Sequence, residues 1–432
     1  MTASDPGPEE PAAHPGGGLL VRARSLAPDL SPLRTSPDFR RLFFGNGVSF
    51  MGSQLTAVAV PFQVYRITGS SLAVGLLALC HLVPQLTLSL VGGSLADSMD
   101  RRSLVRRCEL GMLAVSLLLA ANAMVGTPRL WVLYVLAFVG AGFDALGRPA
   151  LWAMIPRLVP PEQFVAASSL NALYFNLGAA AGPAAAGFLI AGAGLSATYI
   201  VDALTFAAAL VALSRMAPLP PADDAPAPGW SSIVEGLRYA RARPVLMGTY
   251  LIDYNAMVFG MPRALFPALA SSLGGGARTL GFLYGAPYAG ALLVTMTGGW
   301  MRQLRRQGAG IAVSVLVWGL AILAFGLTRS LVAALFFLAV AGGADMVSGV
   351  FRMAIWNRII PDHIRGRLAG IELANVTSGP ALGDVEAGTV AALTSVRFSV
   401  VSGGVACMVG VAVLSVFLPS LLSYDSEHPT AS

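Results

Sequence analysis

Lysine is absent from the chain, and charged residues of any kind are scarce. Only 12% of the 432 residues are charged, whereas 55% are hydrophobic, and the mean hydropathy is +0.69. A soluble protein of this composition would expose large apolar patches to water. Because one membrane-spanning helix needs about 20 mostly apolar residues, the composition excludes an ordinary soluble domain and predicts an all-α membrane protein with about twelve spans.

Cysteine is also rare, and the familiar catalytic motifs are missing. Cys80, Cys108 and Cys407 all fall in apolar stretches, where buried free thiols are more common than disulfides or metal ligands. The sequence contains no nucleophile elbow, no HExxH, no phosphate-binding loop and no His/Cys cluster with ligand spacing. We therefore expect no enzyme, no cofactor and no metal, and the missing phosphate-binding loop argues against ATP-driven pumping.

All 28 basic residues are arginines, and they recur in small clusters between the apolar stretches. A continuous basic stripe would indicate nucleic acid, but this spacing is typical of the positive-inside rule. With the N-terminus placed in the cytoplasm, most arginines fall on the cytoplasmic side, and the inverted topology would move them outside. We expect a multi-pass protein of the bacterial inner (cytoplasmic) membrane, with both termini cytoplasmic and no nucleic-acid partner.

Apolar runs, broken by arginine clusters or Gly/Pro turns, predict six spans in each half of the chain. Between the halves, the Pro/Ala/Asp-rich stretch from Pro218 to Trp230 is unsuited to a helix, and a short amphipathic helix is expected after it. The expected spans lie near 41–65, 71–96, 104–125, 129–152, 164–193 and 196–214, then near 245–271, 279–300, 308–327, 331–356, 367–393 and 396–420. The domains are then a disordered tail (1–36), an N-terminal bundle (37–216), a cytoplasmic linker with the amphipathic helix (217–242), a C-terminal bundle (243–421) and a second tail (422–432).

An internal repeat relates the two halves. Several polar and glycine residues recur at one fixed offset of 201 residues, and a looser pairing aligns the double glycine at Gly92 with the one at Gly298. Chance agreement between apolar strings is the alternative, but matching polar residues favour duplication, which is typical of transporters built from two related halves. The matches are Gly142 with Gly343, Asp144 with Asp345, Arg157 with Arg358, Pro160 with Pro361, Gly182 with Gly383 and Gly187 with Gly388.

The loop after the second predicted span reads GGSLADSMDRRS and resembles the signature loop of the major facilitator superfamily. The matching residues are Gly93, Leu95, Ala96, Asp97, Arg101 and Arg102. The resemblance implies a gating role: the glycine permits close helix approach, the aspartate caps or ion-pairs with a helix end, and the basic pair holds the loop at the cytoplasmic surface. The loop departs from the pattern at two positions, and a plain polar turn with topology-setting arginines is the alternative.

Longer segments are similar to a narrower branch of that superfamily, the enterobactin exporter and its drug-efflux relatives. They include SPLRTSPDFRRLFFGNGVSFMGSQLTAVAVPFQVY, FPALASSLGGGARTLGFLYGAPYAGALL, IIPDHIRGRLAGI and ALGDVEAG. The resemblance covers about Ser31 to Leu418 and implies export of a siderophore or another amphipathic small molecule, driven by proton antiport. An uptake symporter is the alternative within transport, and a non-catalytic membrane protein is the alternative outside it.

An ionisable residue at mid-membrane costs at least about 2.5 kcal/mol, so its presence there calls for a function. We therefore expect the ionisable residues within the predicted spans to couple transport to protons. Asp253 is the preferred proton carrier. Asp144 and Arg148, four residues apart, share a helix face and act either as a coupling pair or as a packing salt bridge. Asp384 and Glu386 are further candidates. Asp345 is also one, although we expect an ion pair with Arg352 seven residues later; Glu109, Asp202 and Glu372 are expected near helix ends.

Polar and aromatic side chains in other spans are candidates for the substrate pathway. His81 and Gln85 share a face of the second span, and His81 is suited to relay protons near neutral pH, although a packing histidine is more common. Gln54, Tyr174 and Arg263 complete the candidate cavity residues. The partners expected are a small-molecule substrate, protons and the lipid bilayer, with the protein acting as a monomer by rocker-switch motion.

Overall fold

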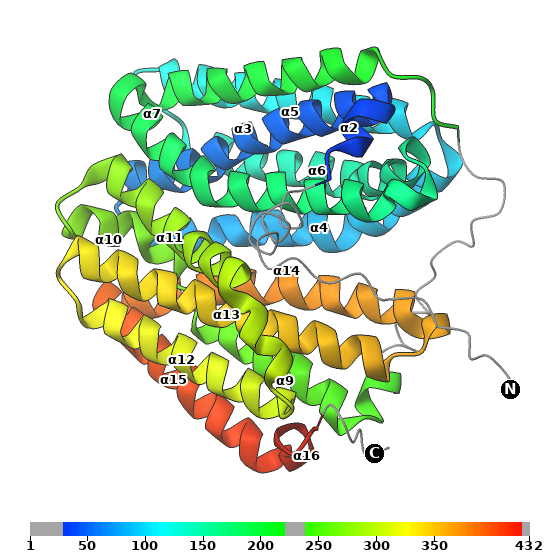
Figure 1. Ribbon diagram of the computed structural model, residues 1–432. Helices are drawn as coiled ribbons and strands as arrows, with labels where there is room; N and C mark the ends of the chain where they lie inside the picture. Colours follow the sequence, from blue (N-terminus) through cyan, green and yellow to red (C-terminus); the bar gives the residue numbers. More distant parts are fainter. Residues whose placement is uncertain (1–28, 221–237, 426–432) are drawn as a thin grey trace, which may run out of the picture.

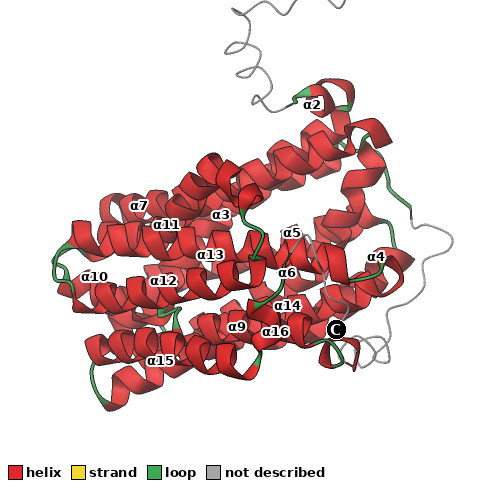
Figure 2. Cartoon of the chain, turned by 60° about the horizontal axis from the view of Figure 1, so that its bottom comes forward, coloured by secondary structure: helices red, strands yellow, loops and turns green. Residues whose placement is uncertain are grey.

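The computed structural model describes residues 29–220 and 238–425. All regular elements in these two ranges are helices, and most run side by side along the long dimension of the molecule (Figures 1 and 2). The predicted all-α architecture is therefore confirmed. The predicted amphipathic helix of the linker lies mostly outside the described residues.

The first half contains long helices joined by short turns. Short α2 precedes them, so the prediction of a disordered tail through residue 36 is wrong for its last residues; Pro32 packs there against the body of the protein. The elements are α2 (Ser31–Thr35), α3 (Pro37–Thr68), α4 (Ser71–Ser98), α5 (Arg101–Met124), α6 (Leu130–Leu158), η1 (Pro161–Gln163) and α7 (Phe164–Ser214).

The second half has the same character, except that its first span is interrupted. The elements are α9 (Pro244–Phe259), η2 (Arg263–Leu265), α10 (Phe266–Ser272), α11 (Gly276–Thr297), η3 (Gly298–Gln303), α12 (Gln307–Leu327), α13 (Leu331–Ile359), α14 (Asp362–Leu393), α15 (Val396–Phe417) and α16 (Pro419–Leu422). The span expected at 245–271 is thus broken after Phe259, where Gly260 and Pro262 disfavour a continuous helix.

Seven helical stretches in the described ranges are long and apolar enough to cross a membrane: α4, α6, η1 with α7, α11, α12, α13 and α15. The longest of them, α7, bends sharply at Gly194, whose φ of 85° and ψ of 176° are rarely accessible to other residues. It therefore consists of two consecutive segments, in agreement with the spans expected at 164–193 and 196–214. The protein is a multi-pass membrane protein.

The helices of the two halves pack in corresponding ways. In the first half, α4 and α5 both pack on α6, and in the second half α11 and α12 both pack on α13. Likewise, α3 and α5 pack on α7, and α9 packs on α14 and α15. Small residues allow the closest approaches: a Cβ atom on Gly92 of α4 would lie 2.7 Å from the Leu146 carbonyl oxygen of α6.

The two halves meet mainly through two helix pairs, α7 with α11 and α4 with α14. Glycines permit both contacts: a Cβ on Gly187 would lie 2.6 Å from the Ala277 carbonyl oxygen, and a Cβ on Gly388 would lie 2.9 Å from that of Ser71. The two contacts lie toward the start of α4 and α11 and toward the end of α14 and of the first segment of α7. All four of these helix regions are at the same end of the molecule, away from residues 214–220 (Figure 1).

Candidate functional site

Asp144 of α6 accepts hydrogen bonds from two side chains in the first half. Arg148 donates to its Oδ2 atom at 2.6 Å, and Gln85 of α4 donates to the same oxygen at 2.6 Å. The expected pairing of Asp144 with Arg148 is thus formed, while Gln85 is already engaged by that carboxylate. His81, one turn before Gln85, is exposed, and its Nδ1 atom lies 3.0 Å from the carbonyl oxygen of Leu77 in its own helix.

Three acids expected near helix ends lie inside their helices instead. Asp202 is only 1% exposed and accepts hydrogen bonds from Thr56 at 2.6 Å and Ser116 at 2.7 Å, while its Oδ1 atom is buried without a partner. Glu109 of α5 accepts from a serine hydroxyl of α3 at 3.0 Å, and Glu372 lies in the eleventh position of α14. The prediction of helix-end positions was wrong for all three. Asp202 and Glu109 are supported by hydroxyl donors from other helices, which sequence spacing does not reveal.

Asp253 of α9 forms a buried ion pair with Arg352 of α13, and Asn375 of α14 also donates to it at 2.9 Å. Asp253 is 1% exposed and Arg352 is 7% exposed. The ion pair expected between Asp345 and Arg352 is therefore wrong. Since α9 packs against both α13 and α14, the aspartate of another helix reaches the guanidinium in place of the one two turns away on its own helix.

A group of polar residues lies around the break between α9 and α10. Arg263 begins the 3-10 turn η2, and the amide of the next residue donates to Asp384 of α14 at 2.8 Å. The Tyr284 hydroxyl of α11 donates to the carbonyl oxygen of Arg263 at 3.3 Å. A cavity of about 190 Å³ adjoins this break and is lined by Arg263, Tyr284, Tyr288 and Asp345 among others.

The sequence candidates for a substrate pathway do not converge on one cavity. Arg263 lines the cavity at the helix break, but Gln54, His81, Gln85 and Tyr174 do not. Gln54 packs against Gly182 of α7, and the Tyr174 hydroxyl accepts a hydrogen bond from Asn46. Glu386, two residues after Asp384, makes no hydrogen bond or ion pair within the described ranges.

The signature-like loop contacts the end of α7. Arg101 lies 3.7 Å from Asp97 and donates to the carbonyl oxygens of Ala96 and Ala153, while Arg102 donates to Met216 at 2.5 Å and to Ser214 at 3.2 Å. The close helix approach expected of Gly93 belongs to its neighbour Gly92, because a Cβ on Gly93 would meet no heavy atom within 4 Å. The rotation of α4 about its axis determines which of the two adjacent glycines faces α6, and the sequence motif alone does not reveal that rotation.

Asp100 was not a candidate, yet it ties the same loop to the residues after α7. Its carboxylate accepts hydrogen bonds from the Ser103 amide at 2.7 Å and from the Leu219 amide at 2.5 Å. Partial burial raises the pKa of Asp100, but these hydrogen bonds and the nearby Arg102 outweigh burial and hold that pKa below its usual value. Asp100 is the N-cap residue of α5. An aspartate directly before a helix is a common capping pattern, and this pattern was the sequence signal that pointed to a structural role for Asp100.

The three cysteines are free; Cys108 and Cys407 are buried and Cys80 is partly buried. This outcome agrees with the expectation of apolar thiols in the spans.

Known proteins match this chain over nearly its whole length. The family model described as "Transmembrane secretion effector" matches residues 27–430. The enterobactin exporter EntS of Shigella boydii serotype 18 and that of Escherichia coli O81 are each 30% identical to the chain over 395 residues, covering 90% of this chain and 94% of theirs.

Solved structures of transporters share the fold at low sequence identity. A POT family transporter in complex with 5-aminolevulinic acid has a TM-score of 0.72 at 12% identity, covering 89% of this chain and 97% of its own. A bacterial homolog of the human lysosomal transporter Spinster, in an inward-facing and unoccupied conformation, has a TM-score of 0.69 at 14% identity, covering 90% and 98%.

Proposed function

Because the chain belongs to the transmembrane secretion effector family of major facilitator transporters, we propose that it is a proton-coupled exporter of an amphipathic small molecule. A siderophore or an antibiotic is the cargo class we infer. The observation that carries the proposal is the 30% identity to enterobactin exporters, which extends over 90% of this chain and so includes both halves. We extend from those relatives the outward direction of transport, not their cargo itself.

The proposed architecture is twelve spans in two pseudo-symmetric six-helix bundles, 37–216 and 243–421, joined by a cytoplasmic linker at 217–242. The bend in α7 supports counting it as two spans, and the break after α9 supports counting α9 with α10 as one. A structural correspondence supports the repeat: a Cβ on Gly142 of α6 would lie 3.2 Å from Leu88 of α4, and a Cβ on Gly343 of α13 would lie 3.1 Å from Val294 of α11. Both termini are cytoplasmic in this proposal, and the monomer is the working unit.

Alternating access is the mechanism we infer for export. The glycine-mediated contacts between the halves lie at the end away from residues 214–220, which is the periplasmic end in the proposed topology. The structure then represents an inward-facing state, in which cargo enters from the cytoplasm. Outward opening separates α7 from α11 and α4 from α14 at these contacts, and proton uptake accompanies cargo release.

The coupling acids are the intramembrane carboxylates Asp144, Asp253, Asp345, Asp384 and Glu386. Asp144 and Asp253 have arginine partners, so a change in their protonation would break an ion pair, within α6 for Asp144 and between α9 and α13 for Asp253. Replacing each acid singly by its amide is expected to abolish pH-driven transport for at least one of them. Undiminished transport in all five variants would overturn proton coupling through these residues.

The signature-like loop is proposed to bias the cytoplasmic gate through Asp97, through Arg101, which binds α6, and through Arg102, which binds the end of α7. Gly93 faces open space in this structure, so it is available to a helix that approaches when the cytoplasmic side closes. Asp97→Asn is expected to change the transport rate or the balance between inward- and outward-facing states. An unchanged rate and balance would remove the loop from the gating mechanism.

Metabolite profiling of cell pellet and medium, with and without the gene, tests the direction of transport. An exporter predicts that one compound builds up inside the deletion strain and falls in its medium, and re-expression reverses both changes. A protonophore is expected to reproduce the effect of the deletion, because the proton gradient supplies the energy. A compound that instead remains in the medium and is depleted inside the cells would favour uptake symport.

A further inference from the structure

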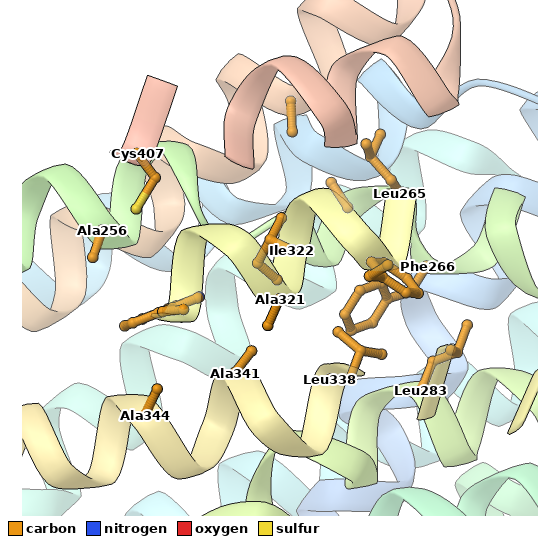
Figure 3. Close-up of a cluster of buried hydrophobic side chains, with 14 of the residues drawn as sticks. Ala256, Leu265, Phe266, Leu283, Ala321, Ile322, Leu338, Ala341, Ala344 and Cys407 are labelled. Carbon is orange, nitrogen blue, oxygen red and sulfur yellow. The ribbon is translucent and has the colours of Figure 1, made fainter. Parts of the chain in front are cut away.

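The cavity at the α9–α10 break has an apolar and aromatic wall with few polar groups. Figure 3 shows side chains of this wall converging from α10, α12 and α13, including Phe266, Ile322, Leu338 and Ala341. The indole N–H of Trp318 already donates to the Gly260 carbonyl oxygen at 2.9 Å, so it offers the cavity ring carbons rather than a free donor. The wall therefore suits an apolar or aromatic group.

The charges around the cavity do not balance. Arg263 lies in the field of Asp384, which also holds the backbone at the break, so the guanidinium has a carboxylate close to it. Asp345 lines the cavity near the middle of α13 and makes no hydrogen bond or ion pair within the described ranges. The remaining titratable groups on the wall are the phenols Tyr284 and Tyr288 of α11. The unmatched charge is thus that of one carboxylate.

The first half shows what Asp345 lacks. Its counterpart at the 201-residue offset is Asp144, whose carboxylate accepts from Arg148 and Gln85. At the same offsets, Arg148 is replaced by Gly349 of α13, and Gln85 corresponds to Ala291 of α11 through the pairing of Gly92 with Gly298. Ala291 itself lines the cavity. The second half thus has neither the cation nor the amide at these positions, and the Asp345 carboxylate borders the cavity instead.

We propose that this cavity binds an organic cation, a positively charged nitrogen attached to an aromatic or apolar body, with Asp345 as its counter-charge. Asp345 is partly buried near the middle of α13, where a carboxylate without a partner is costly, and a cation or a proton relieves the cost. Aromatic rings next to a carboxylate favour such a nitrogen, because cations are attracted to ring faces. Binding of the cation and of a proton to Asp345 then exclude each other. The proposal rests on the proposed function for its use in transport, since it makes a cationic group part of the cargo.

Binding to the purified full-length protein tests the assignment without requiring transport. The probe is phenyltrimethylammonium, a permanently charged ion with one aromatic ring, titrated by calorimetry, with benzoate as the anionic probe of similar size. We expect saturable binding of the cation, stronger than that of benzoate, and rising in affinity with pH as Asp345 loses its proton. Asp345→Asn is expected to weaken cation binding by about tenfold or more, since a desolvated charge pair is lost.

A second variant restores the arrangement of the first half. Ala291→Gln places an amide beside Asp345, as Gln85 does for Asp144, and is expected to fill the cavity and reduce cation binding. Ala289→Gln on the same helix is the matched control: Ala289 is exposed and does not line the cavity, so binding should equal that of the unaltered protein. The melting temperature of each variant reports whether it is folded.

Three outcomes would overturn the proposal: no saturable binding of the cation, equal affinity in the protein with Asp345→Asn, or tighter binding of benzoate, which would assign the cavity to Arg263 and an anion. Failure of the proposed function is separate. It would show as uptake in the metabolite profile while cation binding stays intact, whereas export with unchanged binding in the Asp345→Asn variant would overturn the cavity assignment alone.

Discussion

Asp253 and Arg352 form an ion pair between α9 and α13, although they stand 99 positions apart in the sequence. Both side chains are almost completely buried, so neither charge has water to replace its partner. The amide of Asn375 adds a donor from α14. One carboxylate thereby links three helices of the second half, directly before the break between α9 and α10.

Removing one member of this pair should destabilise the protein more than removing both. Asp253→Asn removes the ion-pair partner of the buried Arg352 guanidinium, a loss that costs about 3–5 kcal/mol for a buried pair, although the nearby carboxylate of Glu372 offsets part of that cost. Combining it with Arg352→Gln removes that charge, and the double variant should recover much of the lost thermal stability in detergent. A double variant less stable than either single variant would show that the charges do not compensate each other.

The same variants separate packing from coupling. If Asp253 carries a proton during transport, the double variant stays folded but loses the pH dependence of transport. If the pair only joins helices, the double variant keeps that dependence. The melting temperature serves as the control for folding in both cases.

The connection through Asp100 should depend on pH in a defined direction. Because its pKa is lowered in the folded protein, the stabilisation is fully present above the ordinary aspartate pKa of about 4 and is lost as pH falls through the lowered value. At neutral pH, Asp100→Ala should expose the Leu219 amide to hydrogen exchange. Ser98→Ala is the control, since that hydroxyl bonds only to carbonyls of its own helix; equal exchange at Leu219 in the two variants would contradict the connection.

Sequence patterns predicted the helices well because membrane spans depend on local composition. Runs of apolar residues and arginine clusters mark where spans begin and end, and spacing within one helix correctly paired Asp144 with Arg148. The break after Phe259 had a local signal, Gly260 and Pro262, but apolar composition continues across it and masked the interruption.

Contacts between helices could not be predicted from the sequence because they depend on how the helices rotate and cross. Arg352 was therefore assigned to Asp345 of its own helix, although Asp253 lies closer in space. The hydroxyls of Thr56 and Ser116 that support Asp202 come from two other helices. For the same reason the cavity at the break could not be predicted, although Arg263 and Asp345 were both singled out.

The bend within α7 provides a test of the two-segment interpretation. Gly194 has a positive φ with an extended ψ, a conformation that costs other residues about 1–3 kcal/mol. Gly194→Ala should therefore lower the melting temperature, whereas Gly192→Ala should not, because a Cβ on Gly192 meets no atom within 4 Å and its φ is negative. Equal effects of the two substitutions would mean that the bend tolerates a side chain.

Adjacent glycines in the signature-like loop should respond differently to alanine. A Cβ on Gly92 would lie 2.7 Å from the Leu146 carbonyl oxygen and 2.8 Å from that of Ala145, so α4 and α6 must move apart. Overpacking of this kind costs about 1–3 kcal/mol, and Gly92→Ala should lower the melting temperature accordingly. Gly93→Ala should leave the melting temperature of this state unchanged, because its Cβ enters open space. If gating brings another helix onto Gly93, transport should fall in that variant although stability does not. If Gly93→Ala destabilised the protein and Gly92→Ala were tolerated, the close approach would belong to Gly93 and not to Gly92.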